Sequence, residues 1–76
     1  MKYQFEYTDT YGGESNYSWV KRGEVTANDL LHAFRLARKE LGLTGVKGIL
    51  ERWNNDEGKW TPKRSCTVLF VNFKDQ

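Results

Sequence analysis

Polar and apolar residues alternate along much of this chain, but residues 66–73 are apolar on both sides of an expected strand. With a period of two, one face takes Cys66, Val68 and Phe70, and the other takes Leu69, Val71 and Phe73. The rest of the chain contains one convincing helix, which can cover only one of these faces. We therefore expect the second face to be covered by another copy of the chain, by a partner, or by long side chains of neighbouring strands.

Two more strands are predicted near the N-terminus. In residues 1–8 the aromatic residues occupy alternate positions, as in a half-buried antiparallel strand, and residues 9–16 contain the Asp, Gly-Gly, Ser and Asn of a hairpin loop. Residues 17–25 form the second strand, with a bulge expected at Gly23. The residues expected to share one face of this strand are Tyr17, Trp19 and Val25.

Helical periodicity follows in residues 26–41. Thr26 with Asp29 three positions later predicts an N-cap at Thr26, and Gly42 is placed to be the left-handed residue that ends the helix, with Leu43 as its hydrophobic contact. The stripe expected to face the sheet is formed by Ala27, Leu30, Leu31, Phe34, Ala37 and Leu41. Leu36 and Lys39 lie away from the centre of this stripe, so we expect them on the outer side of the helix.

The remaining segments predict a third strand over residues 45–53, with Ile49 and Trp53 on one face, and a turn over residues 54–58. Pro62 cannot donate to a strand ladder, so residues 61–65 are expected to be an edge or irregular connection into the last strand. The prediction is a single α+β domain over residues 1–76, in the order β-β-α-β-β. Its four-stranded antiparallel sheet carries one helix packed on one face.

Composition narrows the class of protein. With 76 residues, core burial gives only modest stability. One cysteine and one histidine exclude an internal disulfide framework and a zinc site built from several Cys and His ligands, and they favour a reducing compartment. No apolar run approaches the roughly 20 residues of a membrane span. We therefore expect a soluble cytoplasmic protein without membrane contact, cofactor or metal.

No catalytic motif is found. His32 and Cys66 lack the third orienting group and the oxyanion site that a nucleophilic pair needs, so we interpret Cys66 as a small buried strand residue and His32 as a solvated helix residue. The spacing of Gly42, Gly45 and Gly48 is better explained by turns than by a nucleotide-binding loop, since a strand rather than a helix follows. We therefore expect a protein that is not an enzyme.

Basic residues allow two interpretations. The formal net charge is only +2, which does not by itself indicate nucleic-acid binding. Lys59, Lys63 and Arg64 nevertheless alternate with Trp60, and such a basic and aromatic segment can contact phosphates and stack on bases. The same charges also protect an edge strand against pairing with another chain, and we favour that explanation.

Aromatic content is high, with three tryptophans, four tyrosines and four phenylalanines. One helix of about four turns cannot cover all of them, so an exposed aromatic patch is expected, and Trp, Tyr and Arg are enriched at interface hot spots. The residues predicted to bind a partner are Trp19, Arg22, Leu36, Lys39, Trp53, Trp60, Lys63 and Arg64.

Three segments of the chain, residues 16–20, 41–46 and 65–70, resemble small proteins encoded by bacteriophages. This resemblance implies a small inhibitor of the anti-CRISPR or host-takeover kind, acting in the host cytoplasm. It implies as partner a host protein or ribonucleoprotein complex that the inhibitor blocks or modulates. A homodimer is compatible with the two-faced strand, and the alternative function is a small nucleic-acid-binding protein using a basic and aromatic surface.

Overall fold

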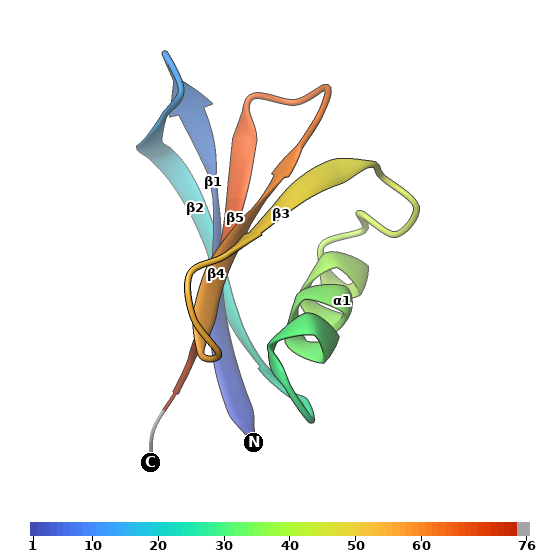
Figure 1. Ribbon diagram of the computed structural model, residues 1–76. Helices are drawn as coiled ribbons and strands as arrows, with labels where there is room; N and C mark the ends of the chain where they lie inside the picture. Colours follow the sequence, from blue (N-terminus) through green and yellow to red (C-terminus); the bar gives the residue numbers. More distant parts are fainter. Residues whose placement is uncertain (75–76) are drawn as a thin grey trace.

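The computed structural model describes residues 1–74 and confirms an α+β fold in which one helix lies on one face of an antiparallel sheet (Figure 1). Within these residues the sheet has five strands rather than the predicted four, in the spatial order β2-β1-β5-β4-β3. The elements are β1 (Lys2–Tyr11), β2 (Glu14–Thr26), α1 (Leu30–Glu40), β3 (Gly48–Arg52), β4 (Glu57–Pro62) and β5 (Thr67–Phe73).

The additional strand is β4, in a segment that the sequence assigned to a turn and an irregular connection. It forms a hairpin with β3 and also pairs with β5, so it lies inside the sheet. Buried and partly exposed residues alternate along β4, but this pattern is hard to recognise in the sequence. The buried residues are Gly58, Trp60 and Pro62, and only Trp60 is large and strongly apolar. Pro62 is tolerated because it is the last residue of the strand, where it lies opposite Gly48.

The strand predicted to be apolar on both faces is β5, and it lies at the centre of the sheet between β1 and β4. Leu69 and Val71 are buried in the core that faces α1. Val68 points to the opposite face of the sheet, and residues of the same chain bury it there as well. Cys66 was predicted to be a buried strand residue, and this prediction is wrong. It lies exposed in the turn before β5, because the strand begins one residue later at Thr67.

The helix ends as predicted but begins three residues later. Gly42 has φ +75°, and the N–H groups of Gly42 and Leu43 bond to the carbonyls of Lys39 and Arg38, which is the Schellman motif. At the other end the N-cap is Asp29, whose carboxylate accepts from the His32 N–H at 2.8 Å. Thr26 cannot cap the helix because it still belongs to β2, opposite Lys2.

The face of α1 that meets the sheet is also rotated relative to the prediction. The buried helix residues are Leu30, Ala33, Phe34 and Ala37. Leu31, placed in the stripe by the sequence, is 48% exposed, whereas Leu36, predicted to point outward, packs against the core. Ala33 is small and fully buried, so the helix backbone can approach the sheet on that side, and Leu36 lies only about 60° from Ala33 around the axis.

Candidate partner-binding surface

The face of the sheet that points away from α1, here called the outer face, carries no helix among residues 1–74 (Figure 1). Strand pairing places one residue from each strand in a row across it. In spatial order the row is Arg22, Glu6, Phe70, Lys59 and Glu51. The half-buried Phe70 of the central strand therefore lies between charged residues on both sides.

Two large apolar side chains extend this surface at the β3 edge. The Trp53 ring lies 6.2 Å from the Phe70 ring, and its Nε1–H donates to Glu51 Oε2 at 2.7 Å. Ile49 shares the outer face, because its neighbour Leu50 lies opposite the core residue Trp60. Ile49 is 63% exposed and Trp53 is 47% exposed. The β3 edge thus presents an apolar pair in which the tryptophan is held by a hydrogen bond.

At the other side of the outer face, β2 departs from regular pairing. The register shifts between Thr8 and Thr10, so that Asp9 alone faces residues 16–19 of β2. Asp9 holds this bulge together by accepting from Ser18 Oγ at 2.6 Å, Ser18 N at 3.0 Å and Asn16 Nδ2 at 2.9 Å. The sequence predicted a bulge at Gly23, and this is wrong. Gly23 pairs regularly with Phe5, whose ring fills the space that a Cβ would occupy.

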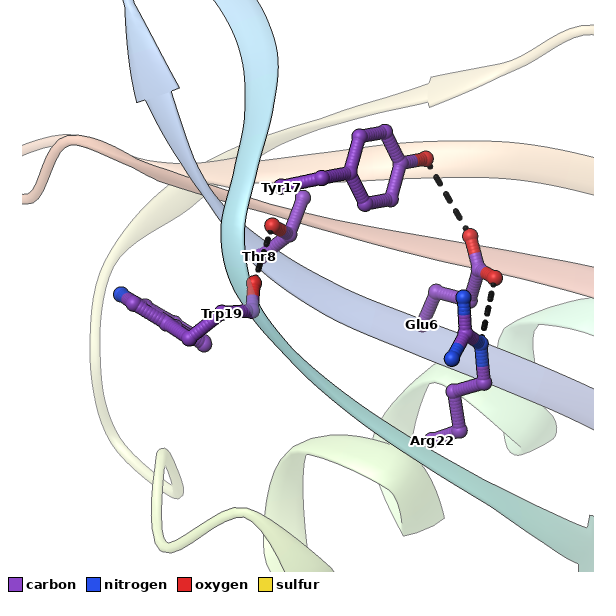
Figure 2. Close-up of polar contacts among 5 residues, drawn as sticks. All are labelled: Glu6, Thr8, Tyr17, Trp19 and Arg22. Atoms are coloured by element: carbon purple, nitrogen blue, oxygen red, sulfur yellow. Dashed lines mark hydrogen bonds and ion pairs between the residues drawn. The ribbon is translucent and has the colours of Figure 1, made fainter.

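The bulge positions Tyr17 on the outer face. Tyr17 has φ +56°, a conformation that non-glycine residues seldom adopt and that needs support from its surroundings. Figure 2 shows its ring pointing toward Glu6, where the Tyr17 hydroxyl donates to Glu6 Oε1 at 3.2 Å and Arg22 Nε donates to Glu6 Oε2 at 2.8 Å. Partial burial and the negative charge of Glu6 raise the pKa of Tyr17, which therefore stays a neutral donor.

Trp19 points the other way, which corrects the prediction that Tyr17 and Trp19 share a face. Its ring lies 5.5 Å from the ring of Tyr7, on the side of the sheet that bears α1, and Figure 2 shows it directed away from Tyr17. The Trp19 carbonyl accepts from the buried Thr8 hydroxyl at 2.6 Å (Figure 2). The bulge thus breaks the alternation that a regular strand would impose on residues 17 and 19.

The Asp9 bonds lead to a prediction for acid stability. Hydrogen bonds from Ser18 and Asn16 lower the pKa of Asp9 from 3.8 to about 2. Because the folded pKa lies below the ordinary value, this stabilisation is fully present above pH 3.8 and is lost as the pH falls toward about 2. In urea unfolding at about pH 5 and about pH 2, the wild type should lose more stability than Asp9→Asn. Equal losses in both proteins would show that the bulge does not depend on the ionised carboxylate.

A hollow of about 310 Å³ lies on the outer face beside the tip of the β1–β2 hairpin. Gly13, Glu14 and Ser15 of the hairpin line one side, and Lys59 and Phe70 belong to the other. The chain reverses at Gly12 and Gly13, whose φ values of +60° and +87° confirm the predicted glycine turn. The outer face is therefore mixed: the half-buried Phe70 lies between the charged residues Glu6 and Lys59, and the exposed apolar side chains Ile49 and Trp53 lie at the β3 edge.

The eight residues predicted to bind a partner do not form one surface. Arg22 and Trp53 lie on the outer face, and Trp19 lies on the α1 side of β2. Lys39 is exposed on α1, and Lys63 and Arg64 are exposed in the turn after β4. The prediction that Leu36 and Trp60 bind a partner is wrong. Leu36 packs against the core, and Trp60 belongs to the core with an exposed fraction of 3%.

Sequence reasoning omitted three outer-face residues from the site: Tyr17, Ile49 and Phe70. Ile49 could have been included, since its alternation with Trp53 was visible in residues 45–53. Phe70 was correctly placed opposite Leu69 and Val71, but the face it would occupy was left open. No local signal identifies Tyr17, because its direction depends on a bulge created by Asp9 from the neighbouring strand.

A scan against protein-family models found no match, and searches of curated proteins and of solved structures found none either. In the part of the chain that the structure describes, no three His, Cys, Asp or Glu residues are grouped so that they could hold a metal ion. None of the helices within residues 1–74 is long and apolar enough to cross a membrane.

Proposed function

We propose that this protein is a non-enzymatic binding protein that docks on a macromolecular complex of a host cell through its outer face and blocks or modulates that complex. The observation that carries the proposal is the set of large exposed residues on a sheet face without a covering helix, namely Tyr17, Ile49 and Trp53. The more specific version is an anti-CRISPR inhibitor, which rests on the resemblance of three chain segments to phage proteins.

The arrangement of these side chains favours binding. Glu6 holds Tyr17 and Glu51 holds Trp53, so both rings have a fixed direction before a partner arrives. A side chain that is already ordered loses less conformational entropy on association, and aromatic residues with such support are frequent hot spots. Phe70 between them contributes an apolar floor.

The experiment compares outer-face variants with a matched control in bacteria whose CRISPR system targets a test phage. The wild-type protein should restore plaque formation, and purified protein should bind the corresponding ribonucleoprotein complex. Trp53→Ala and Ile49→Ser should each weaken that binding by about tenfold or more, as truncated hot spots do. Leu31→Ser, which changes an equally exposed apolar residue on α1, should leave binding intact.

Two outcomes would contradict the proposal. If the wild type binds but the outer-face variants bind as well as Leu31→Ser, another surface carries the interaction. If the wild type neither restores plaques nor binds any complex in a panel of CRISPR types, the anti-CRISPR version is wrong.

A further inference from the structure

A second hollow, distinct from the outer face, is surrounded by basic residues. It measures about 430 Å³ and is lined by Val46, Lys47, Lys63, Arg64 and Ser65. The Lys63 N–H donates to the Lys47 carbonyl at 3.0 Å, which extends the β3–β4 pairing by one residue beyond Gly48 and Pro62. Two segments that are 16 positions apart in the sequence therefore bring Lys47, Lys63 and Arg64 together.

Arg38 of α1 adds a fourth positive charge behind this hollow. Its Nη2 donates to the Val46 carbonyl at 2.8 Å, and its guanidinium lies 4.4 Å from the centre of the Trp60 ring. Its buried Nε has no hydrogen-bond partner among the described residues. No acidic residue lines the hollow, and the ion pairs found within residues 1–74 involve other side chains, Arg22 with Glu6 and Lys74 with Glu24. Among residues 1–74, no ion pair with a carboxylate compensates the positive charge here.

Protection of a sheet edge does not explain the positive charges of Lys63 and Arg64. The sequence favoured that explanation for Lys63 and Arg64, on the expectation that they precede an edge strand. In the structure they follow β4, which lies inside the sheet, whereas the edges are β2 and β3. A cluster of exposed cations around a concave surface instead matches the phosphates of a nucleic-acid backbone.

We infer that the hollow formed by Lys47, Lys63, Arg64 and Ser65 binds the phosphate backbone of double-stranded nucleic acid without reading its sequence. A single strand fits less well, because proteins that bind single strands stack the bases on exposed aromatic rings. The only aromatic residue in β4 is Trp60, which is buried under Arg38 and cannot reach a base. The residues lining the hollow include no aromatic side chain.

The test is fluorescence anisotropy of a labelled DNA duplex, with one strand of the same sequence as a second probe. Contacts by Lys47, Lys63 and Arg64 predict that the logarithm of the association constant falls with the logarithm of salt concentration with a slope of about −3. Duplex should bind more tightly than single strand. The double variant Lys47→Glu/Lys63→Glu should weaken duplex binding by at least about tenfold at low salt.

The matched control is Lys2→Glu/Lys21→Glu, which lowers the formal net charge by the same amount at exposed positions away from the hollow. This control should retain most of the duplex affinity. A milder pair, Lys63→Gln/Arg64→Gln, tests the same site if the double glutamate variant is found unfolded by circular dichroism, and it should lower the salt slope by about two.

The inference is overturned if the wild type shows no salt-dependent duplex binding, if it binds single strand more tightly, or if both Lys→Glu pairs weaken binding equally. The last result would mean that net charge rather than this hollow attracts the duplex. Because the outer-face residues are unchanged in these variants, binding to a protein partner should be retained, and failure of one proposal is distinguishable from failure of the other.

Discussion

Replacing Trp60 by alanine should lower the free energy of unfolding by about 3–5 kcal/mol. Its indole fills the space above Gly48, where a Cβ would lie 2.6 Å from the ring, and it packs beneath the guanidinium of Arg38. Alanine would leave a cavity in the core and remove the cation–π contact. A chain of this length typically has about 4–11 kcal/mol of stability in total, so the variant should be partly unfolded or melt at least about 12 °C lower.

Trp53→Ala is the matched control for this prediction, since it removes the same side chain from an exposed position. Trp53→Ala removes one ring contact and one hydrogen bond, so the free energy of unfolding should fall by about 1 kcal/mol or less. Thermal melting of the two variants side by side separates the roles. If Trp60→Ala melted like Trp53→Ala, the burial of Trp60 in the core would be contradicted.

Phe34→Ala should be of similar severity, again about 3–5 kcal/mol, because Phe34 is the largest side chain that α1 buries against the sheet. Without it the helix would keep only Leu30 and two alanines as fully buried contacts. Urea unfolding monitored by circular dichroism measures the loss.

Leu31→Ala provides the comparison within the same helix. The sequence placed Leu31 and Phe34 in one stripe, whereas the structure leaves Leu31 about half exposed. Its replacement should therefore change the unfolding free energy by about 0.5 kcal/mol or less. Equal losses in the two variants would mean that the helix is rotated toward Leu31 rather than toward Leu36.

The outer face shows how far sequence reasoning reached for the candidate site. Alternation placed Ile49 and Trp53 on one face of a strand, and the structure confirms this. The prediction that the Tyr17 and Trp19 side chains share one face was wrong, because side chains alternate with a period of two only where the strand pairing is regular. The departure here is set by Asp9, whose hydrogen bonds to Asn16 and Ser18 cross between strands.

The basic residues also show that the sequence alone does not reveal which side chains share a surface. Lys63 and Arg64 were visible as a local group, but Lys47 and Arg38 join them only through the Lys63–Lys47 and Arg38–Val46 hydrogen bonds. Trp60 lies among these charges in the sequence and yet is buried, so adjacency along the chain did not show which side chains share a surface.

By itself the sequence determined the features that neighbouring residues control: the two apolar faces of residues 67–73, the helix and its end at Gly42, and the glycine turn of the first hairpin. Tertiary structure alone decided the strand order, the existence of β4 as a separate strand and the rotation of α1 toward Leu36. The physical reason is that backbone preferences and periodicity act over a few residues. The partner of a strand and the buried side of a helix depend instead on contacts between distant segments. There the packing of Ala33 against the sheet, and of Trp60 beneath Arg38 of α1, outweighs the local pattern.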